Sequence, residues 1–283
     1  DRDLLVIPSL AIHMDRTLNS GHAFNPQVDM QPLYGLEGSK PFPALLAEAA
    51  GVKEAGTCGI LPFNILTRRP WRTIMRRSTP FLRNAHARPR FFSAPRIDDL
   101  ECAATTLYGF LDAAPETDSA CAPVWAMFDN EEVGSSTRQG ADSSFLRDVL
   151  DRILNAIPHS AQAQAQAFAN SFVLSADNAH AVHPNFADKA DSCNKVILGK
   201  GVVVKVNASQ KYTTSGLTGA IFKEICRKNN VPVQVFANRA DLPGGSTLGN
   251  LQSHTVPIPM VDIGLAQLAM HSPYETCGSG DTE

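Results

Sequence analysis

Residues 91–283 alternate short apolar runs with stretches of helical spacing, and this alternation limits the possible folds more than any other feature. Five of the runs have the length of strands: 123–128, 171–176, 202–206, 231–236 and 258–264. Between them, apolar residues recur at helical spacing in three stripes, formed by Leu100, Ala103, Leu107 and Phe110, by Phe145, Leu146, Val149, Leu150, Ile153 and Leu154, and by Leu217, Ile221 and Ile225. Such alternation predicts a layered α/β domain with a central, mostly parallel sheet.

Residues 1–90 have a different character, with several prolines and little sustained helical spacing beyond residues 43–51. We therefore expect a smaller, β-rich lobe over 1–90, next to the α/β domain over 91–283. Residues 68–90 carry eight arginines and no acid. This stretch is either a solvated or interface-forming basic face or a contact for nucleic acid. Its few aromatic residues and the net charge of -3 disfavour nucleic-acid binding.

The composition excludes several classes of protein. Apolar residues make up 43% and charged residues 19% of the chain, which is typical of a soluble globular protein with a sizeable core. No apolar run approaches the ~18 to 20 residues that span a bilayer, and no secretory signal is visible. The six cysteines are scattered without a Cys-x-x-Cys pair, so neither a disulfide framework nor a thiolate zinc site is expected, and a reducing cytoplasm fits.

Two acidic pairs in the α/β part are candidates for chemistry. Asp98 and Asp99 stand just before a predicted helix, where they either cap the helix or bind a ligand. Glu131 and Glu132 follow the apolar run 123–128, and two adjacent carboxylates repel each other unless a positive group faces them. A divalent metal would supply that charge, with one glutamate as ligand and the other handling protons. The alternative is an exposed acidic turn.

Histidines and a further aspartate follow two other apolar runs. Asp177, His180 and His183 lie within seven residues after the run 171–176, and His271 comes soon after the run 258–264. These are oxygen and nitrogen ligands suited to zinc, although each histidine is also compatible with a structural role. Because the four segments all come after strands or before helices of one predicted sheet, they can converge. Carboxylates with one imidazole and no thiolate suit a catalytic pair of zinc, manganese or cobalt ions.

Six blocks of residues 91–283 resemble the catalytic domain of the aspartyl aminopeptidase family of dinuclear zinc peptidases. They occur in order as SAPRIDDL, FDNEEVGS, SADNAHAVHPNF, VVKVNASQKY, GGSTLGN and MVDIGLAQLAMHS. Residues 7–16, IPSLAIHMDR, are similar to a segment of the domain that the family inserts between the two halves of its catalytic fold. The resemblance therefore implies that residues 1–90 belong to an inserted lobe that serves as lid and in oligomerisation.

The resemblance also implies roles for individual residues. It makes Glu131 the general base. It makes Asp98, Glu132, Asp177 and His271 the metal ligands, with Asp98 bridging the two ions. Contacts with substrate are implied for His13, which would act across a subunit interface, and for His180, Lys205 and Tyr212. It implies two Zn2+ ions per subunit, with Mn2+ or Co2+ as alternatives. It further implies peptide substrates and a homo-oligomer, a tetrahedral dodecamer built from dimers.

The chain departs from the family pattern near its start, where no counterpart of the first metal-binding histidine occurs. We expect an N-terminal segment to be missing, which would leave the ion on the Asp177 side short of protein ligands, because a catalytic zinc usually has three. These 283 residues should then hold one metal tightly at most.

Taken together, the residues and the resemblance predict a cytoplasmic metallo-aminopeptidase that removes an acidic N-terminal residue from peptides. One alternative is a related dinuclear zinc aminopeptidase or deacylase with a broad or neutral preference. Another is a catalytically silent assembly or nucleic-acid-binding protein, against which the presence of Glu131 argues, because a scaffold has no need of that base.

Overall fold

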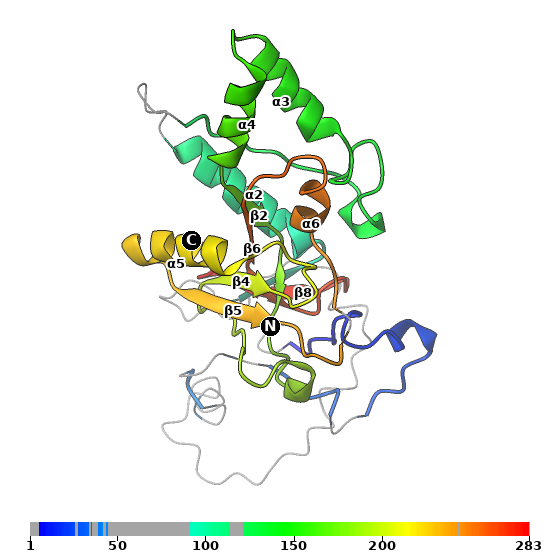
Figure 1. Cartoon of the computed structure of the whole chain (residues 1–283). Coiled ribbons are helices and arrows are strands. Elements are labelled where there is room, and N and C mark those ends of the chain that lie inside the picture. The colour runs from blue at the N-terminus through cyan, green and yellow to red at the C-terminus, as the bar shows by residue number, and fades with distance from the viewer. Residues whose placement is uncertain are drawn as a thin grey trace.

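The computed structural model describes residues 6–25, 28–33, 35, 39–41, 44, 91–113, 121–242 and 244–282. In this part of the chain, strands and helices alternate as predicted (Figure 1). The apolar runs 171–176, 202–206, 231–236 and 258–264 form β2 (Val173–Ala176), β4 (Val202–Val206), β5 (Val233–Ala237) and β6 (Met260–Gly264). The layered α/β architecture is therefore confirmed.

The strands form two four-stranded sheets within the described residues. The first has the order β2-β6-β4-β5, with β2 parallel to β6, β4 parallel to β5, and β4 antiparallel to β6. The second has the order β1-β8-β7-β3 and is mixed. It contains β1 (Phe91–Ala94), β3 (Ala179–His180), β7 (Ala266–Leu268) and β8 (Glu275–Gly278), none of which the apolar runs predicted.

The two sheets adjoin at a bend, because the chain passes directly from one to the other twice. Asp177 and Asn178 connect β2 to β3, and Leu265 connects β6 to β7. At this bend the backbone of Gly264 approaches that of Asp177 so closely that a Cβ on Gly264 would meet the Asp177 carbonyl oxygen. Only glycine fits there, so this close approach helps to fix the position of Asp177.

The predicted helical stripes form α2 (Ile97–Asp112), α3 (Phe145–Asn155) and α5 (Gly216–Lys228). α5 begins with a capping box between Ser215 and Thr218, and its Phe222 and Cys226 pack against the first sheet. The polar Ala-Gln stretch forms α4 (Ala161–Ala169), and a short α6 (Leu248–Gln252) precedes β6. α3 and α4 lie together and project from the sheets (Figure 1), joined by the hydrogen bond from Gln164 Nε2 to Asp151 Oδ1.

The prediction of a strand at 123–128 is wrong. This run forms no strand and pairs with no strand of the described chain, and Val124 and Met127 are 58% and 61% exposed. An apolar run of this length is compatible with a strand, but a strand also requires a neighbouring backbone with which to pair.

Little of residues 1–90 is described. Val6 and Leu33 pair in an isolated antiparallel bridge, and Val6 packs into the core of the second sheet. The short 3-10 helix η1 (Leu18–Ser20) is the other regular element described there. The β-rich lobe and the division at residue 90 therefore stay predictions, and the arginine-rich stretch 68–90 lies outside the described residues. No helix described here combines the length and the apolar character needed to cross a membrane.

Candidate metal centre

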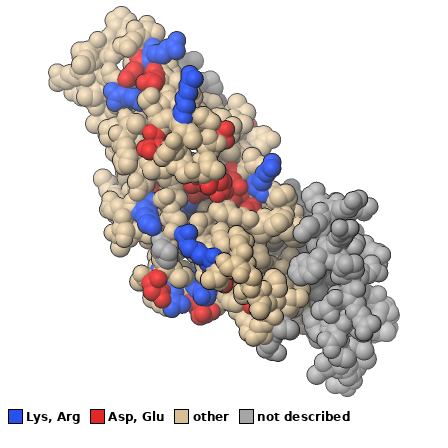
Figure 2. Space-filling model, turned by 90° about the vertical axis from the view of Figure 1, so that its right-hand side faces the viewer, with Lys and Arg blue, Asp and Glu red and all other residues tan. Residues whose placement is uncertain are grey.

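Acidic side chains gather near the middle of one face of the molecule (Figure 2). The predicted ligands meet because the strands before them are linked: β1, β8 and β7 are neighbours in the second sheet, and β2 leads into β3, which pairs with β7. Asp98 comes shortly after β1, Asp177 directly after β2, and His271 in the turn between β7 and β8. Glu131 and Glu132 lie in the 3-10 helix η4 (Glu131–Val133). The four segments singled out in the sequence thus converge, although the segment with Glu131 and Glu132 follows the irregular run 123–128 rather than a strand.

The first group of candidate ligands consists of Asp98, Glu132 and His271. The Nε2 atom of His271 lies 3.0 Å from Oδ2 of Asp98 and 3.0 Å from Oε2 of Glu132. Hydrogen bonds to these two carboxylates raise the pKa of His271 to about 10, against the opposing effect of burial. The three ligand atoms lie within 4.8 Å of one another, close enough for one cation to bind all three. The donor set therefore fits a metal ion.

The second group consists of Asp98, Asp99 and Asp177, whose carboxylate oxygens lie within 4.8 Å of one another. Burial, with added repulsion from Asp177 and Glu132, raises the pKa of Asp98 to about 7, although its hydrogen bond with His271 opposes the shift. Burial and the repulsion of Asp177 and Asp98 raise the pKa of Asp99 to about 9. This concentration of negative charge favours protons or a cation, so this group also fits a metal ion.

The resemblance assigned a metal-binding role to Asp98 and none to Asp99. Both residues have non-helical dihedral angles within α2, whose cap is Arg96 without a side-chain hydrogen bond, so the capping role of the two aspartates stays a prediction. Oδ1 of Asp99 accepts a hydrogen bond from the backbone N–H of Asn178 at 3.2 Å. Asp99 therefore offers a carboxylate on the Asp177 side, where the sequence predicted too few ligands.

Glu131 differs from its neighbour Glu132 in both environment and grouping. Glu132 is 52% exposed and faces His271, whereas Glu131 is half-buried and belongs to neither group of candidate ligands. Burial, together with repulsion by Asp177 and Glu132, raises the pKa of Glu131 to about 7. A carboxyl with such a pKa can both accept and return a proton near neutral pH.

Lys205 lies inside β4 and is 2% exposed. Its Nζ is 2.9 Å from Oδ2 of Asp177 and 5.6 Å from the centre of the Tyr212 ring. Burial alone would lower the pKa of Lys205, but the Asp177 carboxylate outweighs burial and the pKa is raised. Lys205 therefore stays charged and offsets part of the negative charge of the site. Tyr212, which is also buried, lies between Lys205 and Phe236.

Three histidines meet beside the carboxylates. The ring centre of His13 lies 4.9 Å from that of His271 and 5.7 Å from that of His180. Burial, the neighbouring His13 and Lys205 lower the pKa of His180 to about 3, and burial with His271 lowers the pKa of His13. Both rings are therefore neutral and can donate or accept hydrogen bonds. Here His13 belongs to the same chain as the site, and the predicted contribution to a neighbouring subunit stays a prediction.

His183 has a structural role, which was the alternative interpretation of the histidines that follow the run 171–176. Its ring is buried, with Nε2 3.1 Å from the carbonyl oxygen of Pro8, and its Nδ1 accepts a hydrogen bond from the N–H of Asn185. It thus helps to attach the N-terminal segment that carries His13.

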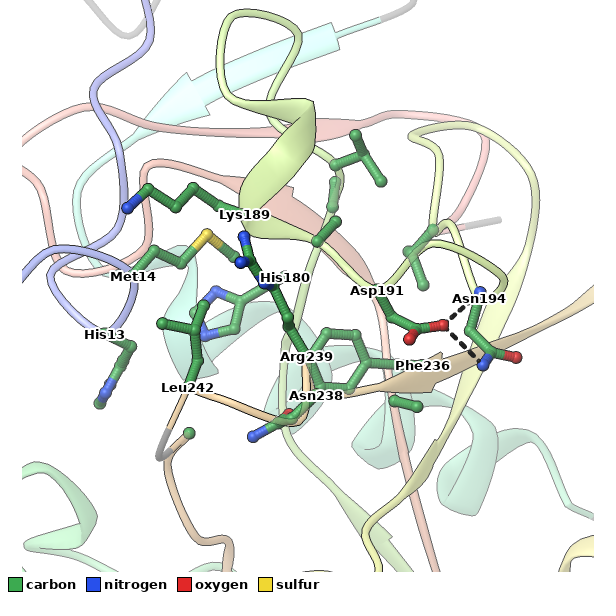
Figure 3. Close-up of a pocket in the computed structure, with 16 residues that line it drawn as sticks. His13, Met14, His180, Lys189, Asp191, Asn194, Phe236, Asn238, Arg239 and Leu242 are labelled. Carbon is green, nitrogen blue, oxygen red and sulfur yellow. Dashed lines mark hydrogen bonds between the residues drawn. The ribbon is translucent and has the colours of Figure 1, made fainter.

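A pocket opens next to His13 and His180 (Figure 3). Apolar side chains of Met14, Phe236 and Leu242 line it, together with the cationic side chains of Lys189 and Arg239. Arg239 is held in place by an ion pair with Asp241, 2.7 Å from Nε to Oδ1, and by a hydrogen bond that it donates to the carbonyl of Asp188. The pocket is largely apolar, has charged side chains in its lining and lies next to His13 and His180, so it has the chemistry of a side-chain subsite.

Sequence reasoning also missed Glu275. This residue is 2% exposed, and its carboxylate accepts hydrogen bonds from the backbone N–H groups of His271 at 2.6 Å and Asp98 at 3.0 Å. The signal that could have found it is an acid four residues after His271, just beyond the last of the six blocks.

Comparison with known proteins identifies the family. The family described as aminopeptidase I zinc metalloprotease (M18) matches residues 85–283, which is more than half of the chain. The chain belongs to the M18 family. The resemblance to aspartyl aminopeptidases found in the sequence is thereby confirmed at the level of the family, as is the expectation of zinc as the family metal.

Individual M18 relatives extend the match to nearly the whole chain. The probable M18 family aminopeptidase 2 of Clostridium acetobutylicum is 40% identical over 283 residues, 99% of this chain and 62% of the relative. Aspartyl aminopeptidase 1 of Schizosaccharomyces pombe is 36% identical over 299 residues, 100% of this chain and 62% of the relative. The chain thus spans less than two thirds of the length of these relatives.

Among solved M18 structures, that of the S. cerevisiae mApe1 dodecamer matches with a TM-score of 0.61 and 29% sequence identity. The match covers 69% of this chain and 43% of the yeast chain. It supports the layered α/β fold.

Proposed function

We propose that this chain forms the catalytic part of a metallo-aminopeptidase that removes an acidic N-terminal residue from peptides, using two metal ions. The observation that carries the proposal is the equal 3.0 Å approach of His271 Nε2 to Asp98 and Glu132, with Glu131 alongside but outside both candidate ligand groups. This arrangement separates metal binding from proton transfer within one pair of adjacent glutamates.

Asp98 would bridge the two ions, with Glu132 and His271 completing one site and Asp177 the other, where Asp99 is a further candidate. Zinc held there would polarise the peptide carbonyl and lower the pKa of a bound water, with Mn2+ or Co2+ able to do the same. Glu131 would take the proton from the attacking water and return it to the leaving amine.

The N-terminal side chain of the substrate would enter the pocket shown in Figure 3. His180 and Tyr212 would orient the peptide by hydrogen bonding. Lys189 and Arg239 line this pocket, together with Asp191. Lys205 does not line it, but it lies beside Asp177 and would favour an acidic substrate once Asp177 binds metal. The name of the Schizosaccharomyces pombe relative, an aspartyl aminopeptidase, supports this preference.

The oligomer is also part of the proposal. We propose a homo-oligomer in the cytoplasm, a dodecamer built from dimers, with residues 1–90 as an inserted lobe and His13 acting on a neighbouring subunit. The yeast relative named as a dodecamer supports the assembly. The apolar face of α3 also supports it, because Phe145 and Ile153 are exposed there.

The test is the turnover of chromogenic substrates with N-terminal Asp, Glu and Leu, with and without a chelator. We expect chelator-sensitive turnover that is fastest for Asp and Glu. Equal rates on Leu would instead support the alternative of broad or neutral specificity. Absence of turnover in metal-loaded protein would contradict the enzyme proposal and leave the assembly or nucleic-acid-binding alternatives.

A further inference from the structure

We infer that Glu275 is a positioning residue that holds the backbones of Asp98 and His271 at the distance that metal binding requires. Its Oε1 accepts the N–H of His271 at 2.6 Å, and its Oε2 accepts the N–H of Asp98 at 3.0 Å. The two ligands are 173 residues apart in the chain, yet their side chains meet at 3.0 Å. One buried carboxylate thus connects the two backbone segments directly.

Both backbone segments need such a partner. Asp98 has extended dihedral angles at the start of α2, so its N–H lies outside the helical hydrogen-bond pattern. His271 has a φ of 68°, in the left-handed region that non-glycine residues adopt only when surrounding contacts hold them there. A buried N–H without a partner is also unfavourable. The carboxylate of Glu275 therefore supplies a hydrogen-bond acceptor to both backbone segments at once.

The position of Glu275 in β8 explains how it reaches them. In the β1–β8 ladder, Glu275 stands opposite Ala94, so it faces the end of β1 just before the turn that leads to Asp98. The next pair of the same ladder is joined by a 2.8 Å hydrogen bond between the hydroxyls of Ser93 and Thr276. This hydrogen bond stabilises the pairing of β1 with β8 next to the candidate metal ligands. Because both oxygens of Glu275 accept backbone N–H groups, Glu275 acts through the ligands and is not itself one of them.

This inference rests on the proposed function only in taking Asp98 and His271 as metal ligands. The experiment compares the wild type with Glu275→Gln and Glu275→Ala by Co2+ titration, followed by visible absorption and by competition with a chromophoric chelator. Asp281→Asn is the matched control, because Asp281 likewise accepts two backbone N–H groups, from Gly199 at 2.6 Å and Gly201 at 2.7 Å, just beyond the other end of β8. Circular dichroism and thermal melting establish that each variant is folded.

We expect Glu275→Ala to bind Co2+ about 10- to 100-fold more weakly than the wild type and to change the Co2+ spectrum, as is usual when the support of a ligand is removed. Glu275→Gln should lose less, because its one carbonyl oxygen can still accept one N–H. If Glu275→Ala does not fold, Glu275→Gln alone tests the inference. Asp281→Asn should bind as the wild type does.

Wild-type affinity and spectrum in a folded Glu275 variant would overturn the inference and leave the proposed function intact. An equal loss in Asp281→Asn would also overturn it, because the effect would then be one of general stability. Wild-type protein that binds no Co2+ would overturn the metal site itself, and the inference with it.

Discussion

Replacement of Glu131 by glutamine should stabilise the metal-free protein at alkaline pH while it removes turnover from the metal-loaded protein. Burial and the nearby carboxylates of Asp177 and Glu132 raise the pKa of Glu131 from 4.5 to about 7. In the metal-free protein, folding therefore disfavours the charged form of the Glu131 carboxylate. Glutamine carries no charge, so the folded Glu131→Gln protein avoids this cost. The same carboxylate is the proposed base, so glutamine also removes the proton acceptor.

The size of the effect on stability follows from the raised pKa. Between the unfolded pKa of 4.5 and the folded pKa of about 7, the folded chain binds a proton that the unfolded chain has lost, so stability falls as the pH rises through this range. At about 1.4 kcal/mol per unit of pKa, the loss reaches roughly 3 kcal/mol above pH 7 and is close to zero near pH 4. Glu131→Gln should recover an amount of this order at pH 8.

The assay is urea unfolding of wild type and Glu131→Gln at pH 4.5 and pH 8 in the presence of a chelator. Glu224→Gln is the control, because Glu224 is an exposed residue of α5 whose pKa is lowered by Arg227. We expect no stabilisation from this control at pH 8. After metal is restored, Glu131→Gln should keep its metal content and lose turnover by ~100-fold or more. A Glu131→Gln protein that is less stable than wild type at pH 8, or one that keeps near-normal turnover, would refute the reasoning.

Three further predictions concern neighbouring residues. Glu132→Ala should lose metal and activity together, because Oε2 of Glu132 lies 3.0 Å from His271 Nε2, and full metal content after dialysis would contradict its role as ligand. Lys205→Met should lower kcat/KM on Asp substrates by roughly 10- to 100-fold and leave Leu substrates little changed. An equal loss on both would identify a structural lysine that supports Asp177. Mixing His13→Ala protein with Glu131→Gln protein should restore partial activity if subunits share sites, and the absence of recovery in verified hybrids would count against sharing.

Much of the α/β fold could be predicted because its information is local. The apolar stripes of α2, α3 and α5 and the β-branched run of β4 show their periodicity within a dozen residues. The run 123–128 has similar local features and fails as a strand because no backbone pairs with it. β7 and β8 were missed for the opposite reason, since their strand character comes from pairing with each other, with β1 and with β3.

The chemistry of the site was also visible in the sequence, because carboxylates and histidines follow the strands that bring them together. Asp98, Glu132, Asp177 and His271 all take part in the two candidate ligand groups or in their direct contacts. The sequence could not predict that Asp177 pairs with Lys205, that Asp99 faces Asp177, or that His13 packs against His271. These contacts depend on how far apart distant segments lie once the sheets have formed.

The sequence by itself determined which types of residue follow the apolar runs, and it determined the helices α2, α3 and α5 and the strands of the first sheet, since these follow from residue type and spacing along the chain. Only the tertiary structure decided which atoms meet. His271 and Asp98 are 173 residues apart, and they come within 3.0 Å because β1 and β8 pair and because Glu275 accepts the N–H groups of both. Burial in that setting, rather than residue type, also raises the pKa of Glu131 to about 7.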